Sequence, residues 1–192
     1  MPDLNPPSVI NGLAAAWLFA RGRAAGLLLI PPGMDSARHS FLAALVCLPL
    51  FVVLRLIAWW LQGAPPSGLP VALAGDLVGY ALGWVGFALA SKILADQAKR
   101  GGNWPQFIAA WNWTNLVQYL LLVVLLIPAA LGLPAWVGNA MGLAAVGYAV
   151  WLEWFVTRTA LGVQSSTAVM FVVLDLALGL FIGSMTARIA GQ

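Results

Sequence analysis

Five long apolar stretches constrain the fold of this chain more than any other feature of its sequence. A transmembrane helix needs about 20 apolar residues to cross roughly 30 Å of hydrocarbon, and each stretch reaches that length. The stretches cover residues 41–62, 70–95, 107–131, 135–156 and 163–189. We therefore predict an all-α protein whose residues 41–192 form a polytopic bundle of five transmembrane helices.

Composition argues against a soluble globular domain. Only 8% of the 192 residues are charged and 62% are hydrophobic, whereas a soluble domain carries about 25% charged residues. The links between the apolar stretches are short, and glycine and proline punctuate the first three of them. Short links make neighbouring helices antiparallel and leave no room for a soluble domain between the spans.

The positions of the basic residues predict the orientation, because cytoplasmic loops carry an excess of Lys and Arg. If the N-terminus is cytoplasmic, only Arg188 falls on the outer side, and Arg55 lies within the first span. The other basic residues then face the cytoplasm: Arg21, Arg23, Arg38, Lys92, Lys99, Arg100 and Arg158. This bias predicts an N-in, C-out topology. The preference for Arg over Lys, with abundant Ala, Leu and Gly, is typical of a bacterial source, so we expect an inner-membrane protein.

Residues 1–40 are predicted to form a cytoplasmic segment that contains an amphipathic helix at the membrane interface. Three apolar residues at helical spacing mark the face that would rest on the membrane: Ile10, Leu13 and Trp17. The alternative is a sixth span over residues 9–30. That span would bury Arg21 and Arg23 near mid-membrane at about 3 kcal/mol each, so we favour the interfacial helix.

Charged residues within the apolar stretches are expected to share one depth. At 1.5 Å per residue, Arg55 and Asp76 lie roughly 10 Å and 9 Å below the outer ends of two consecutive helices. We therefore predict an ion pair between them. Asp175 in the fifth stretch and Gln118 in the third are expected at a comparable depth, so the four residues are predicted to form one intramembrane polar layer.

This predicted layer has two interpretations, because an intramembrane charge is costly without a partner or a purpose. As a structural clasp the layer fixes the register of the helices, and as a relay it carries protons or ions. A second polar cluster is predicted in the inner half, where Asn112 and Asn115 share a helix face and an Asn112–Glu153 contact is expected. We interpret its amides as links between helices.

Glycines spaced four residues apart predict close contacts between helices, because they let two backbones approach. They occur in three of the apolar stretches: Gly75, Gly79 and Gly83; Gly138 and Gly142; Gly179 and Gly183. We call these rows of glycines the glycine ridges. We expect them to pack against other helices within the bundle, and the alternative is that they form a homodimer face.

Sequence motifs for catalysis are missing. His39 and Cys47 are the single histidine and the single cysteine, too few for the usual transition-metal sites. The sequence contains no HExxH, no Gly-x-Ser-x-Gly and no phosphate-binding glycine loop. It also lacks a basic cluster dense enough for nucleic acid. We therefore expect no enzyme activity, no cofactor, no metal and no nucleic-acid partner.

A family resemblance rests on topology and on a few short sequence motifs. These motifs are SFLAAL at residues 40–45 followed by Pro49, Asn103-Trp104, and Asn112-Trp113. With its N-terminal segment and five close spans, the chain resembles the small Yip-type membrane proteins. The motifs are similar to those of small polytopic proteins of alphaproteobacteria. The resemblance implies an outward C-terminus and supplies no catalytic residues.

Two functions follow from these observations. The first is a non-enzymatic scaffold, assembly factor or subunit of an inner-membrane complex, with the lipid bilayer and other membrane subunits, or a second copy of the chain, as partners. The alternative is a small transporter or channel in which Arg55, Asp76 and Asp175 line a polar path.

Overall fold

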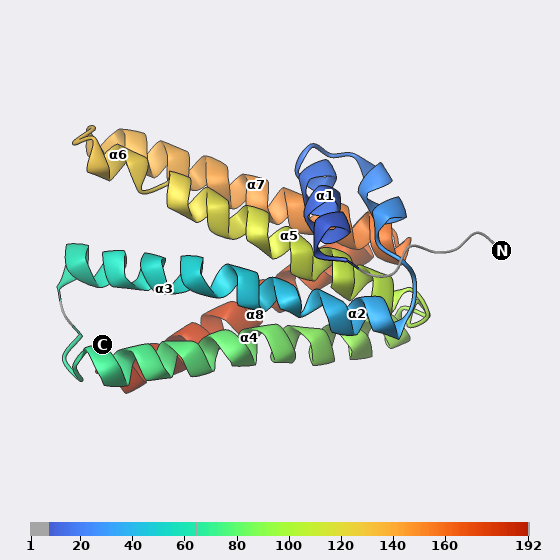
Figure 1. The fold of residues 1–192 in the computed structure, drawn as a ribbon, viewed down its shortest axis with the longest axis horizontal. Helices are drawn as coiled ribbons and strands as arrows, with labels where there is room; N and C mark the ends of the chain where they lie inside the picture. Colours follow the sequence, from blue (N-terminus) through green and yellow to red (C-terminus); the bar gives the residue numbers. More distant parts are fainter. Residues whose placement is uncertain (1–7, 64, 192) are drawn as a thin grey trace.

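The protein is described by a computed structural model that covers residues 8–63 and 65–191, and every regular element within them is helical. The elements in chain order are α1 (Val9–Ala20), the 3₁₀-helix η1 (Ala24–Leu29), α2 (Met34–Ser40), α3 (Leu42–Gln62), α4 (Leu69–Gln97), α5 (Trp104–Val124), α6 (Ile127–Ala130), α7 (Ala135–Leu161) and α8 (Ser165–Ala190). The five long helices form an elongated bundle, and the N-terminal elements lie at one end of it (Figure 1).

The five predicted spans are confirmed as five helices that are long and apolar enough to cross a membrane. Two boundaries differ most from the prediction. The first candidate span begins at Met34, because α2 leads directly into α3. The third ends at Val124 rather than at residue 131, and α6 follows with Pro128 in its first turn. Proline suits a helix start but interrupts a continuing helix, which is why α5 stops early.

The N-terminal segment packs on the bundle through the small residues of α1. Gly12, Ala15, Ala16 and Phe19 are buried, and α1 contacts α5 and η1 most extensively. Two hydrogen bonds fix the segment in place. The Tyr148 hydroxyl of α7 donates to the carbonyl oxygen of Ala20 at 2.7 Å, and Gln106 Nε2 of α5 donates to that of Ile30 at 2.7 Å.

The alternative of one continuous helix over residues 9–30 is wrong. The helix α1 ends at Ala20, and Gly22 takes a left-handed conformation with φ of 68° before η1 begins. The helix α1 has 12 residues and extends only about 18 Å, which is too short to span a bilayer. Ile10 and Trp17 of α1 are exposed, and the interfacial position predicted for them stays a prediction.

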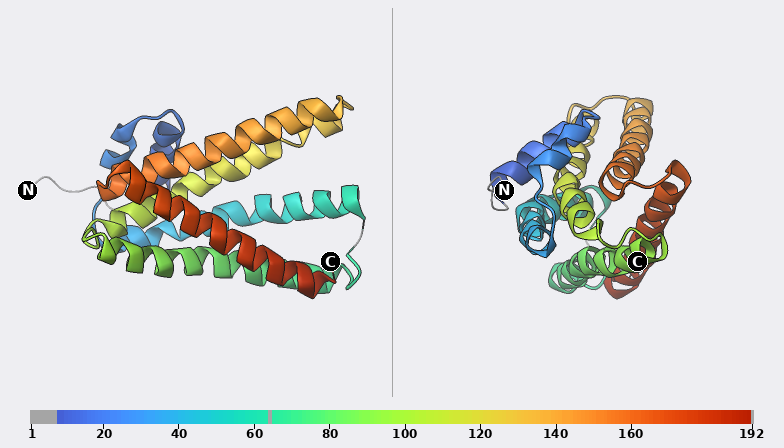
Figure 2. Two further views of the ribbon diagram at one scale, coloured as in Figure 1. Left: turned by 180° about the vertical axis from the view of Figure 1, so that it is seen from behind. Right: turned by 90° about the vertical axis from the view of Figure 1, so that its right-hand side faces the viewer.

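The bundle has two unequal halves. Helices α5 and α7 diverge from α3 and from the pair α4–α8 toward the end where α6 lies (Figures 1 and 2). The buried residues of α5 all fall between Trp104 and Thr114, and those of α8 between Ala168 and Val172. We call the part beside α1 and α2 the packed half and the part beside α6 the open half.

Helix neighbours determine where a site can form. The helix α4 packs mainly on α8, α5 packs on α7, α3 and the N-terminal elements, and α7 packs on α8. Although α3 and α4 follow one another, they are not among the closely packed pairs of the described elements. The helices α3, α4, α5 and α8 can therefore surround a space without filling it.

Candidate functional site

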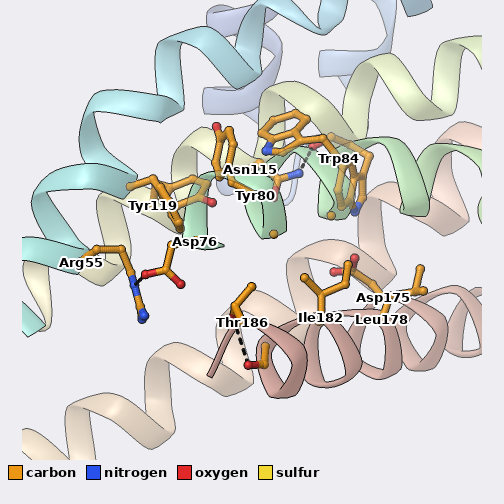
Figure 3. A pocket seen from close by; sticks show the side chains of 16 residues that line it. Arg55, Asp76, Tyr80, Trp84, Asn115, Tyr119, Asp175, Leu178, Ile182 and Thr186 are labelled. Carbon is orange, nitrogen blue, oxygen red and sulfur yellow. Dashed lines mark hydrogen bonds and ion pairs between the residues drawn. The ribbon is translucent and has the colours of Figure 1, made fainter. Parts of the chain in front are cut away.

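A cavity of about 370 Å³ lies between α3, α4, α5 and α8. Figure 3 shows its polar and aromatic side chains converging from opposite walls. Its lining comprises Phe51, Arg55, Asp76, Gly79, Tyr80, Gly83, Trp84, Trp111, Asn115, Tyr119, Asp175, Leu178, Gly179, Ile182, Gly183 and Thr186. The lining joins three of the four residues predicted for the polar layer, Arg55, Asp76 and Asp175, to several that the sequence did not single out.

The predicted ion pair between Arg55 and Asp76 is confirmed. Arg55 Nε of α3 donates to Asp76 Oδ2 of α4 at 2.5 Å, and the guanidinium also lies 5.6 Å from the centroid of the Trp59 ring. Asp76 is buried, whereas about a third of the Arg55 side chain is exposed, at 35%. Because α3 and α4 do not pack closely, this pair is a main link between them on the side of the cavity nearest the open half.

A second link between the same helices comes from Tyr80 of α4. Its hydroxyl donates to the carbonyl oxygen of Ala44 at 2.6 Å, and its ring lies 4.7 Å from that of Phe51. The two links hold α3 over the cavity as a wall.

Asp175 does not share a layer with the ion pair, contrary to the prediction. Thr186 of α8 lies against Gly79 of α4, next to Asp76, and Asp175 precedes Thr186 by eleven residues, about 16 Å along a helix. Within the part of the chain that the structure describes, no hydrogen bond or ion pair reaches Asp175. The prediction counted depth from the ends of apolar stretches, and these ends do not lie in one plane.

Gln118 is not part of the cavity lining, which corrects a second prediction. The α5 residues that face the cavity are Trp111, Asn115 and Tyr119. They are spaced four residues apart and so share a helix face, whereas Gln118 is rotated about 100° from Tyr119. The spacing of Asn115 and Tyr119 was the sequence signal for this face.

The second polar cluster is not connected as predicted. Asn112 Nδ2 donates to Ser40 Oγ of α2 at 2.8 Å instead of contacting Glu153. Asn115 Nδ2 donates to the carbonyl oxygen of Trp111 in its own helix at 3.0 Å, so it does not link helices. Glu153 of α7 is buried, and its Oε1 has no hydrogen-bond partner among the described residues.

Aromatic rings form one wall of the cavity. The Tyr80 centroid lies 6.0 Å from that of Trp84 and 6.2 Å from that of Tyr119. Trp84 in turn meets Trp111 edge to face at 5.7 Å. Residues of α4 and α5 supply this wall, and Asp175 of α8 lies across the cavity from it (Figure 3).

A layer of phenylalanines lies behind the cavity lining, toward the packed half, and contacts it at Trp111. Phe87 stacks on Trp111 at 4.1 Å between centroids, and Phe107 contacts Phe87 at 6.3 Å and Phe171 at 5.5 Å. The three phenylalanines are 0% exposed. We call Phe87, Phe107 and Phe171 the cavity floor.

The expected close packing of the glycine ridges is present at two positions of α4. Gly75 lies against Ile189 and Gly79 against Thr186, both of α8. A methyl group at Gly79 would overlap the Thr186 side chain. These two glycines therefore let α4 and α8 approach.

The other five ridge glycines do not pack against a helix, which corrects the prediction for them. Gly83, Gly179 and Gly183 line the cavity, while Gly138 and Gly142 lie on α7 outside it. An added Cβ at any of the five would meet no described atom within 4 Å. Because α8 runs at an angle to α4 (Figure 2), close contact is confined to one region, which regular spacing alone does not reveal.

Comparisons with protein-family models, curated proteins and solved structures find no match to this chain. They give no support to the resemblance to Yip-type or alphaproteobacterial proteins. In residues 8–63 and 65–191, no group of three or more His, Cys, Asp or Glu residues is placed to hold a metal ion. The cavity is thus the feature on which a functional argument can be built.

Proposed function

We propose that the protein is a small transporter that carries a polar solute through the cavity between α3, α4, α5 and α8. The observation that supports this proposal is an open cavity of about 370 Å³ between four helices, bordered by an ion pair, a free carboxyl group and an amide. Ligand sites typically occupy roughly 300–1,000 Å³. Polar groups inside a membrane bundle commonly mark a solute path.

The cavity wall favours this function over a purely structural clasp. The clasp explains Arg55 and Asp76, which neutralise one another, but it does not explain Asp175, which has no ion-pair or hydrogen-bond partner among the described residues. It also does not explain why Gly83, Gly179 and Gly183 keep the space free of side chains. Residues that preserve an internal volume have a direct purpose in a transporter.

Transport requires that the solute pass the cavity floor. In the proposed mechanism the described conformation has the floor closed, and the solute enters from the open half. A second conformation, in which Phe171 moves away from Phe107, would open the cavity to the other side. With the predicted N-in, C-out orientation in a bacterial inner membrane, entry is periplasmic and release is cytoplasmic.

A cysteine at Gly183 tests this mechanism without knowledge of the solute. The native Cys47, which is buried, is first replaced by alanine to remove background. A membrane-impermeant maleimide is then added to intact cells and to inside-out membrane vesicles that carry Gly183→Cys. We expect labelling from both sides, because the floor opens during the transport cycle.

The matched control is Gly142→Cys on α7, which also has open space at its Cβ but lies outside the cavity. It should react poorly from either side if it faces lipid. Labelling of Gly183→Cys from one side only would mean that the cavity is a blind pocket and would rule out transport.

The scaffold function remains a second candidate because of the outer face of α7. An added Cβ at Gly138 or Gly142 would meet no described side chain within 4 Å, and Trp136 and Leu143 beside them are exposed, the latter at 77%. A partner helix, from another subunit or a second copy, fits such a face. Disulfide crosslinking of Gly142→Cys in native membranes tests it, and the absence of any crosslinked species would remove this candidate.

A further inference from the structure

We infer that the solute of the proposed transport cavity is a small organic cation, recognised by the aromatic wall and the Asp175 carboxylate together. This inference rests on the proposed function and adds the chemical class of the solute. It follows from the charge, the rings and the size of the cavity.

The charge of the cavity lining favours a cation. Arg55 is the single basic residue among the described lining residues, and its charge is matched by Asp76 at 2.5 Å. Asp175 is left as an acid without an ion-pair partner in the described part of the chain. The lining therefore carries a net negative charge when Asp175 is ionised, and an anionic solute would meet repulsion.

The aromatic wall favours an organic cation over a metal ion. The faces of Trp and Tyr rings attract a cation within about 6 Å of their centroids, and this attraction underlies the recognition of quaternary ammonium groups. Tyr80, Trp84, Trp111 and Tyr119 form a continuous series of rings with centroids 5.7–6.2 Å apart. A metal ion would instead need several oxygen ligands, and the wall does not offer them.

The position of Asp175 completes the site. It projects from α8 on the side opposite the aromatic wall (Figure 3), so a bound ammonium group can contact rings on one side and a carboxylate on the other. The glycines beside it, Gly179 and Gly183, leave room for the remainder of the solute. A compact ion such as choline suits a space of this size.

Three probes of similar shape and different charge test the inference on the full-length wild-type protein in lipid nanodiscs. They are choline, its uncharged carbon analogue 3,3-dimethylbutan-1-ol, and the anion 3,3-dimethylbutanoate. Binding is measured by isothermal titration calorimetry. We expect choline to bind about tenfold or more tightly than the neutral alcohol and the anion not to bind.

Two variants assign the preference to the named groups. Asp175→Asn should weaken choline binding by about tenfold and leave the neutral alcohol unaffected. Tyr119→Leu should weaken choline binding by a smaller factor. Asp35→Asn, whose side chain is exposed at 90% and lies outside the cavity, should bind choline like the wild type.

Equal affinity for choline and the neutral alcohol, tighter binding of the anion, or binding of none of the three probes would overturn the inference. The proposed transport function would survive each of these results if Gly183→Cys is labelled from both sides. Conversely, cation binding with one-sided labelling would identify a cation-binding pocket that does not transport.

Discussion

The packed half and the open half share the five long helices but differ in what fills the space between them. In the packed half, large rings meet one another, and the N-terminal elements cover α5 and are tied to it by Gln106. Around the cavity, α3 is held to α4 by an ion pair and a tyrosine hydroxyl, and glycines leave open space. The difference teaches that close packing and open space are separated along the length of the bundle.

Hydrophobicity does not create this difference, because both halves consist of apolar helices. Lipid is as apolar as a leucine side chain, so helices associate through close packing and polar contacts rather than through the hydrophobic effect. Ring-on-ring contacts supply dispersion in the packed half. The open half, with fewer buried residues, depends more on individual polar links.

The largest expected effect compares two phenylalanines of α8. Phe171 is 0% exposed in the cavity floor, and Phe181 is 63% exposed in the open half. Phe171→Ala should lower the free energy of unfolding by about 3–5 kcal/mol because it leaves a hole in close-packed rings. Phe181→Ala should change it by less than about 0.5 kcal/mol. Thermal unfolding in one detergent measures both, and equal losses would erase the distinction between the halves.

A smaller effect is expected at the ion pair. Arg55→Leu leaves the buried Asp76 carboxylate without its partner and should destabilise the protein by about 1–3 kcal/mol. The double variant Arg55→Leu, Asp76→Leu removes both charges and should recover most of this loss. Denaturation of the two variants is compared with the wild type. If the single variant is as stable as the wild type, α3 is not held by this pair.

The smallest stability effect separates two glycines on one ridge of α4. Gly79→Ala crowds Thr186 and should cost about 1 kcal/mol through overpacking. Gly83→Ala meets open space and should stabilise the helix by about 0.5 kcal/mol, because alanine is the better helix former. Melting temperatures of both variants provide the measurement. A loss at Gly83 similar to that at Gly79 would show that α4 and α8 also pack there.

Hydropathy predicted the five long helices because their length and composition leave few alternatives in a chain with so few charges. The Arg55–Asp76 pair was also predictable, since consecutive antiparallel helices place residues equally distant from their link at equal depth. Asp175 was misplaced because its helix is not a neighbour of α3 in the chain. Its depth depends on tilt and register, which packing sets.

The cavity itself could not be predicted from the sequence. From the sequence, Trp84 and Trp111 could not be distinguished from tryptophans of the core or of the membrane interface. A four-residue spacing of glycines is compatible with a helix contact and with a cavity wall equally well. The repeated four-residue spacing of Tyr80 with Trp84 and of Asn115 with Tyr119 marked the relevant faces. Nothing in the sequence showed that these faces meet.

The rate of thiol labelling along α8 tests the central claim most directly. Single cysteines replace Ala168 in the packed half and Gly179 and Gly183 in the cavity, in protein without Cys47 and reconstituted in lipid nanodiscs. A small water-soluble thiol reagent should modify positions 179 and 183 rapidly and position 168 hardly at all, because water fills the cavity and stops at its floor. Equally slow modification at all three positions would show that no aqueous cavity exists and would contradict the account.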